Sequence, residues 1–165
     1  MYALPRSEAI IETMQASMNP DFDWLKPDDC PDHIPLFQLL HTDARKAART
    51  LSCHQEIASS SAFSLGMLAE LDTALSKGPH AYRQLYWEAG LTGQVLYLEA
   101  EAIGKRGTGI GCFFDDSVHE LLGLKDSQFQ SLYHFTIGSP ILDERLETLS
   151  PYSHLPKERQ TNESN

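Results

Sequence analysis

The segment from residue 79 to residue 104 constrains the fold more than any other part of the sequence. Pro79 suits the first position of a helix, and Gly104 suits the position just past its end. Between them, apolar or small residues fill two stripes at helical spacing, a pattern typical of a helix that is buried on most sides. Small residues such as Gly93 allow another element to pack closely. We therefore expect a long, buried central helix, and charges such as Glu88 exclude a lipid-facing one.

Shorter elements are expected on both sides of this helix. Before it, we expect a strand end at 2–5, a helix from Ser7 to about Met18, a loop over 19–33, a buried strand over 34–40 and a short helix from Asp43. Residues 62–71 could form a second buried strand or a helix, because periodicity alone does not decide between them.

After the long helix, the sequence predicts one more helix and one more strand. Asp116 or Ser117 is expected to cap the helix, with Ser117 and Glu120 at capping-box spacing, and Gly123 is expected to end it. The strand covers residues 132–137 and places Tyr133, Phe135 and Ile137 on one face. This order of elements indicates an α+β fold in which the long helix lies against a sheet.

A glycine-rich stretch lies between the long helix and the next one. It reads RGTGIGCFFDD, and its glycines alternate with Thr108 and Ile110, so one face of a strand there has almost no side chains. Glycine inside a strand costs stability and usually marks a place where something lies very close to the backbone. A flat ring would fit this description, and so would a neighbouring strand or helix. The residues alone leave both possibilities open.

Size, charge and cysteine content set limits on the class of protein. A chain of 165 residues is long enough for one domain with a substantial core. Its net charge of -10 argues against nucleic acid or an acidic membrane surface as the main partner. The three cysteines are odd in number and have no paired spacing, which favours reduced thiols in the cytoplasm over a disulfide framework. No run of 18 apolar residues occurs, so we expect no membrane span.

Two sets of residues suggest chemistry and are better explained otherwise. Cys53 and His54 look like a nucleophile and its base, but adjacent residues point in different directions on a helix or a strand. Cys112 and His119 could bind a metal ion, but two further ligands at usual spacing are not evident, so a structural role is favoured and no metal site is predicted.

Three charged residues that follow the glycine-rich stretch have two interpretations each. Asp115 and Asp116 could form an acid pair, although helix capping explains at least one of them at lower cost. Arg145 could be a solvated side chain or a phosphate ligand, because a guanidinium matches phosphate geometry. Composition does not choose between these interpretations.

A longer stretch carries a family resemblance. Residues 82–124, which read YRQLYWEAGLTGQVLYLEAEAIGKRGTGIGCFFDDSVHELLGL, resemble the nitroreductase superfamily, and most of all its SagB-type branch. Residues 51–71 and 132–146 match the same branch in the same order. The resemblance implies one nitroreductase-like domain over residues 1–152. It also implies an α+β sandwich, with the long helix packed on a mainly antiparallel sheet. The polar composition of residues 153–165 predicts a disordered tail.

The resemblance also implies an activity and a set of cofactor-binding residues. Family members are FMN-dependent oxidoreductases: NAD(P)H reduces the flavin, which then reduces a nitro compound or a quinone, whereas SagB-type members oxidise azolines in peptides. They are usually homodimers with the flavin at the subunit interface, and we expect residues 87–93 to pack across such an interface. No catalytic side chain is assigned. The implied cofactor-binding residues are Gly107, Thr108, Gly109, Ile110, Gly111, Cys112 and, as a phosphate ligand, Arg145.

Two departures from the family pattern bear on this expectation. The Arg-Arg-Ser-x-Arg type motif that holds the FMN phosphate is absent, and so is the Lys-Tyr pair linked to azoline oxidation. We therefore expect the chain to be part of a longer protein or a split subunit, and to bind FMN weakly or not at all by itself. A homodimer, or a partner that supplies the missing part, would complete the site. The alternative is a nitroreductase-like module without catalytic activity.

Overall fold

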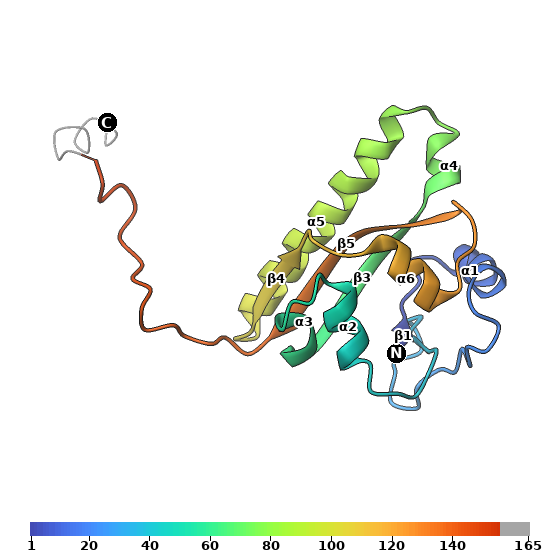
Figure 1. The fold of residues 1–165 in the computed structure, drawn as a ribbon, viewed down its shortest axis with the longest axis horizontal. Coiled ribbons are helices and arrows are strands. Elements are labelled where there is room, and N and C mark those ends of the chain that lie inside the picture. The colour runs from blue at the N-terminus through green and yellow to red at the C-terminus, as the bar shows by residue number, and fades with distance from the viewer. Residues whose placement is uncertain (156–165) are drawn as a thin grey trace.

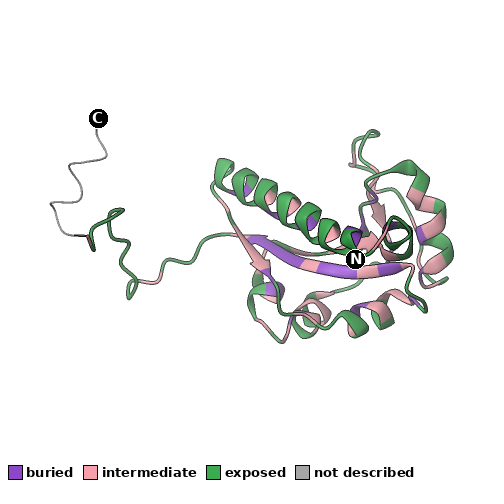
Figure 2. Cartoon of the chain, turned by 90° about the horizontal axis from the view of Figure 1, so that it is seen from above, coloured by how far each residue is buried: buried purple, intermediate pink, exposed green. Residues whose placement is uncertain are grey.

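The chain folds around a small antiparallel sheet with helices on both faces. The structure is a computed structural model and describes residues 1–155, so most of the tail expected over 153–165 lies outside the described residues. The sheet has the order β3-β5-β4, with bounds Phe63–Glu70, Phe129–Gly138 and Arg106–Ile110. The long helix α5 (His80–Ala102) covers one face (Figure 2). The opposite face carries α2 (Arg45–Leu51), α3 (Ile57–Ser60) and α6 (Asp115–Leu122) (Figure 1).

This arrangement confirms the expected α+β fold with a long helix on an antiparallel sheet. Residues 62–71, left open between helix and strand, form β3, and the short helix α4 (Leu71–Leu75) follows directly. The central strand β5 pairs with both neighbours, so that Phe135 lies opposite Leu65 of β3 and Gly109 of β4. No helix within residues 1–155 is both long and apolar enough to cross a bilayer.

The core between α5 and the sheet is built on one face of β5. Tyr133, Phe135 and Ile137 point to this face as predicted, and Phe135 is completely buried. Ala100 of α5 packs against them. Leu65, Met67 and Leu96 are partly buried around this cluster. Because α5 approaches with small side chains, the aromatic rings of β5 fill most of the space between the two layers.

The prediction that α5 is buried on most sides is wrong within the single chain. Its buried residues are all small and lie on the side facing the sheet: Ala81, Ala89, Gly93 and Ala100. On the outer side, Trp87 is 66% exposed and Leu91 is 71% exposed. Gly93 packs inward against the sheet rather than across an interface, because a Cβ there would lie 3.0 Å from Cε1 of Tyr133.

The ends of α5 follow the predicted signals with a shift of one residue. Pro79 occupies the N-cap position, just before the first helical residue. Gly104 follows the C-cap Ile103 and adopts a left-handed conformation with φ of +67°. Glycine has no Cβ to clash in this conformation, so it suits the residue that reverses the chain into β4.

The N-terminal segment forms a second, smaller cluster beside the sheet. β1 (Tyr2–Ala3) pairs with β2 (Phe37–Gln38), so the strand expected over 34–40 shortens to two residues. Ser7 caps the 3-10 helix η1 (Glu8–Ile10), which runs into α1 (Ile11–Ser17). This cluster buries Ala3, Met14, Met18, Leu39, Leu124 and Phe129.

The helix α6 begins earlier than the sequence predicted. Its first residue is Asp115, and no side chain caps it, so the capping box expected from Ser117 and Glu120 does not form. The backbone N–H of Phe114 donates to the carbonyl of Leu51 at 2.8 Å, which fixes the turn directly before Asp115. Gly123 ends the helix with φ of +77°, as predicted.

After β5 the chain leaves the body of the molecule. Residues 139–155 extend away from the sheet as an arm (Figure 1). Ile141, Leu142 and Leu146 are among its most exposed side chains. An arm with exposed apolar side chains adds to the apolar surface that α5 already presents.

A buried polar pair lies on the other face of β5. Nδ1 of His134 and Oγ of Ser52 share a hydrogen bond and lie 3.1 Å apart. The ring of Phe113 stacks on the imidazole, with the two ring centroids 4.4 Å apart. Both Ser52 and His134 are buried. Burial disfavours the charged imidazolium and lowers the pKa of His134 from 6.5 to about 4.

This lowered pKa makes stability depend on pH. The folded chain holds His134 neutral, whereas the unfolded chain protonates it below its ordinary pKa, so the free energy of unfolding falls as pH drops from 6.5 towards 4. At about pH 5 we expect a loss of about 1–2 kcal/mol relative to neutral pH, at about 1.4 kcal/mol per unit of pKa. Urea unfolding at both pH values measures it. His134→Gln should show a smaller loss, and an equal loss in both proteins would contradict this assignment.

Candidate functional site

Both glycines of β4 lie directly against aromatic rings. A Cβ on Gly107 would lie 2.7 Å from Cζ of Phe135, and a Cβ on Gly109 would fall within the hydroxyl group of Tyr133. Any larger residue would force the buried ring of Phe135 or the partly buried ring of Tyr133 to move. The groups that lie close to these two glycines are therefore side chains of β5. This is the packing alternative that the sequence left open.

Tyr97 of α5 completes this packing. Its ring meets Phe135 edge to face with centroids 4.8 Å apart, and its hydroxyl accepts a hydrogen bond from the N–H of Gly109 at 2.7 Å. The N–H of Gly109 is thus bonded within the chain. The sequence offered no signal for this bond, because Tyr97 and Gly109 lie on different elements.

Gly111 has a different environment. No atom lies within 4 Å of an ideal Cβ at this position, and both Gly111 and Cys112 are exposed. Ile110 before them is buried, and the carbonyl of Thr108 accepts a long hydrogen bond of 3.5 Å from Thr136. Within the predicted stretch 107–112, the exposed and uncrowded backbone is therefore at the turn between β4 and α6.

This turn is joined to the loop after α2. Cys53 and Cys112 form a disulfide, with 5.8 Å between their Cα atoms. The amide nitrogen Nε2 of Gln55 donates to the carbonyl of Cys112 at 3.2 Å. The expectation of three reduced thiols is wrong for this pair, because the fold brings together two cysteines that are 59 residues apart in sequence. Cys30 is the third cysteine and is free.

The disulfide also changes the other chemical candidates. Cys53 is bonded to Cys112 rather than to a base, so it does not act with His54 as a nucleophile. His119 accepts the backbone N–H of Ser131 through Nε2 at 3.3 Å. Within residues 1–155, no group of three or more His, Cys, Asp or Glu side chains could hold a metal ion.

The acidic pair at the start of α6 is local. Asp115 Oδ1 accepts the N–H of Asp116 at 3.1 Å, and Asp115 Oδ2 accepts Nε2 of Gln130 at 3.2 Å. Both carboxylates are exposed. Asp115 therefore stabilises the first turn of the helix and links it to β5, and this favours the structural interpretation.

Arg145 is not brought to the glycine stretch. It lies on the arm, where its Nε and Nη2 atoms donate to the carboxylate of Asp143 at 2.8 and 2.6 Å. These hydrogen bonds lower the pKa of Asp143. The side chain of Arg145 is 88% exposed and that of Asp143 is 34% exposed, so water screens this pair and it contributes little to stability.

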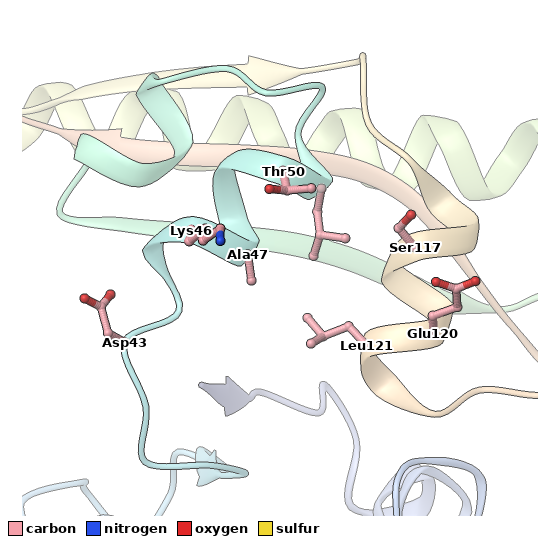
Figure 3. Close-up of a pocket in the computed structure, with 8 residues that line it drawn as sticks. Asp43, Lys46, Ala47, Thr50, Ser117, Glu120 and Leu121 are labelled. Atoms are coloured by element: carbon pink, nitrogen blue, oxygen red, sulfur yellow. The ribbon is translucent and has the colours of Figure 1, made fainter.

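A shallow groove lies between α2 and α6 (Figure 3). It has a volume of about 620 Å³. Its lining residues are Asp43, Lys46, Ala47, Thr50, Leu51, Ser117, Glu120 and Leu121. Lys46 shares the groove with two acidic side chains, so the groove is not a cationic site for a phosphate. None of the glycine-rich residues lines it.

The fold belongs to a known class. No family model and no curated protein matches the chain. Solved structures do match: a protein from Anabaena variabilis assigned to the nitroreductases is 32% identical with a TM-score of 0.60, over 66% of this chain and 23% of that chain. The chain thus spans about a quarter of the Anabaena protein.

Two further structures match over most of the chain. Nitroreductase A from Vibrio parahaemolyticus is 19% identical with a TM-score of 0.53, over 90% of this chain and 64% of its own. NfrA1 from B. megaterium is 17% identical with a TM-score of 0.53, over 97% of this chain and 72% of its own. The chain therefore has a nitroreductase-like fold. These likenesses do not single out the SagB-type branch.

The different environments of the glycines predict different effects of alanine. Gly107→Ala and Gly109→Ala should each lower the free energy of unfolding by about 1–3 kcal/mol, because the added methyl group forces buried rings to shift. Gly111→Ala should change it by no more than about 0.5 kcal/mol, as usual for an uncrowded surface position. Urea unfolding of the three variants measures this order. A loss at Gly111 as large as at Gly109 would contradict the packing described here.

Proposed function

We propose that the chain forms the FMN-binding part of a nitroreductase-type oxidoreductase. The nitroreductase-like fold and the 32% identity to the Anabaena protein support the class. The observation that carries the proposal for this chain is the bare, exposed backbone at Gly111, where a flat ring could approach without meeting a side chain. If the turn at Gly111 were crowded as well, close packing would explain all three glycines and no open backbone would be left for a ligand.

Within this proposal, each predicted site residue has a defined task. FMN supplies the transfer of electrons between NAD(P)H and an acceptor such as a nitro compound or a quinone. The backbone of Gly111 and Cys112 borders the ring, while Gly107 and Gly109 let β4 lie close to the rings of β5 and so hold the turn in place. Thr108 and Ile110 alternate with them along the strand. The dehydrogenation typical of the SagB-type branch is the finer possibility, and we assign no catalytic side chain.

Arg145 is the proposed ligand of the FMN phosphate. A guanidinium can form two parallel hydrogen bonds to a phosphate, as it does here to the carboxylate of Asp143. To bind FMN, the arm would have to bring Arg145 to the site and exchange Asp143 for the phosphate. With a net charge of -10 on the chain, a second cationic donor would be needed for tight binding.

We also propose that the protein is a homodimer through the outer face of α5. The exposed apolar residues of this face are Trp87, Leu91, Val95 and Leu98. A contiguous apolar surface of this kind marks an interaction site. The apolar side chains of the arm, Ile141, Leu142 and Leu146, would lie on the second copy. A small-molecule or peptide substrate, and a cytoplasmic location, remain part of the proposal.

A specific observation favours the alternative of a module that does not bind flavin by itself. Arg145 pairs with its own neighbour Asp143, and within residues 1–155 no guanidinium atom lies within 4 Å of an ideal Cβ at Gly111. A phosphate needs several charge-assisted donors, and loss of one such bond costs about 1.5–3 kcal/mol. Under this alternative the chain keeps the fold and the interface and lacks the reaction.

Titration of FMN fluorescence against the purified chain tests the proposal. We expect weak binding, above the micromolar range, because each missing charged hydrogen bond costs about tenfold or more in affinity. Gly111→Leu should weaken binding at least tenfold by filling the open approach. The matched control Gln15→Leu places the same side chain on the exposed face of α1 and should bind FMN like the unaltered chain. No binding by the unaltered chain would favour the alternative, and equal binding by Gly111→Leu would exclude Gly111 as the site.

The proposed interface has its own test. Leu91→Glu should convert a dimer into a monomer in sedimentation velocity, because a buried carboxylate without a partner is costly. Leu4→Glu is the matched control, since Leu4 is comparably exposed but lies beside β1. A monomer before any substitution would contradict the interface on α5.

A further inference from the structure

The disulfide between Cys53 and Cys112 lies at the surface and joins two loops rather than two core elements. Cys112 is exposed on the turn that carries Gly111, and Cys53 is half-buried on the loop after α2. Exposed disulfides are the ones open to exchange with external thiols, whereas structural disulfides are enclosed. This location separates the bond from the two apolar clusters that hold the fold together.

The backbone on the Cys53 side has an unfavourable conformation. Cys53 has φ of +52° and His54 has φ of +59°, so two consecutive residues other than glycine adopt the left-handed region. Each carries a steric cost from its Cβ. The crosslink and two hydrogen bonds hold this conformation: Nε of Arg49 donates to the carbonyl of His54 at 3.2 Å, and the N–H of Gln55 donates to the carbonyl of Ser52 at 3.1 Å. Opening the disulfide would remove one of these three restraints and let the loop relax.

The two loops are also joined without the disulfide. The N–H of Phe114 donates to the carbonyl of Leu51 at 2.8 Å, and Gln55 donates to the carbonyl of Cys112. After reduction, these hydrogen bonds would keep the two thiols near each other. A pair held together in this way can re-form its bond, so that reduction and oxidation are reversible within the folded chain.

We propose that Cys53 and Cys112 form a thiol–disulfide exchange site whose reaction partners are external thiols, and that its reduction loosens the Gly111 turn. The second part rests on the proposed function, because the turn is the candidate flavin site. A buried disulfide between two rigid elements would support neither the exchange with external thiols nor the loosening of the turn. Here one of the two bonded cysteines is an exposed residue, and the bond fixes the loop that presents the bare backbone.

The exchange runs in two balanced steps. An external thiolate attacks Sγ of Cys112, which is the more exposed residue of the two, and forms a mixed disulfide while Cys53 leaves as a thiolate and takes a proton from water. The second thiol of a dithiol reagent then attacks the mixed disulfide and releases Cys112. Two electrons pass from the dithiol to the protein, the reagent becomes a disulfide, and both cysteines become thiols.

The first experiment uses the full chain with Cys30→Ser, so that Cys53 and Cys112 are the cysteines that remain. Dithiothreitol should reduce the folded protein, and removal of the reagent under air should restore the disulfide, as followed by maleimide labelling and mass spectrometry. Far-ultraviolet circular dichroism should stay unchanged throughout. A bond that opens only in denaturant would overturn the proposal.

The second experiment asks which of the two cysteines is more accessible to an external reagent, because attack at Cys112 requires that its sulfur be the more accessible one. With Cys53→Ser, Cys112 should form a mixed disulfide with oxidised glutathione at least tenfold faster than Cys53 does with Cys112→Ser. The two variants are matched controls for each other, because each leaves one free thiol of the pair. Equal rates, or a faster reaction at Cys53, would contradict attack at Cys112.

The third experiment tests the effect on the turn. Hydrogen exchange at the N–H of Phe114 should become at least threefold faster after reduction, while exchange at β5 should not change. FMN affinity, measured in both redox states, should fall on reduction. Unchanged exchange at Phe114 would overturn the coupling. Absence of FMN binding in both states would instead contradict the proposed function, since the thiol and exchange measurements contain no flavin.

Discussion

The packing of Phe135 determines most of the structure around it. This side chain is completely buried in the central strand, and its ring fills the space between the sheet and α5. Gly107 faces it because β4 has no room for a Cβ, and Tyr97 meets its edge. On the helix, Gly93 and Ala100 allow the close approach. The small residues of β4 and α5 thus have one common explanation: both elements pack closely against the aromatic rings of Tyr133 and Phe135 on β5.

Much of the fold could be predicted because its signals are local. Pro79 and Gly104 mark the ends of α5, and the alternation along β5 identifies its core face. The burial of α5 was predicted incorrectly, because a helix with two apolar stripes does not reveal whether the second stripe is covered by its own chain or by another. The start of α6 was also misplaced, since the hydrogen bond from Phe114 to Leu51 that sets it comes from a distant loop.

The candidate site could be predicted only in part, for a related reason. Glycines packed against rings and glycines open to a ligand look alike in sequence, and only the neighbours separate Gly109 from Gly111. The disulfide between Cys53 and Cys112 depends on a contact between loops 59 residues apart. The number of cysteines could not reveal this pairing. The available hint was that both cysteines lie next to loops that had no other explanation in the sequence. Arg145 was predicted from its chemistry and from the family resemblance, and its position on the arm is set by no local pattern.

The strand order β3-β5-β4 has a consequence for how the chain is made. The middle strand is the last of the three to leave the ribosome, so β3 and β4 have no partner in this sheet until residues 129–138 have been synthesised. During that interval both strands expose unpaired backbone, which is prone to pair with other chains. Contacts between segments far apart in sequence also slow folding. The chain therefore completes its sheet late, in one step that joins elements from both halves of the sequence.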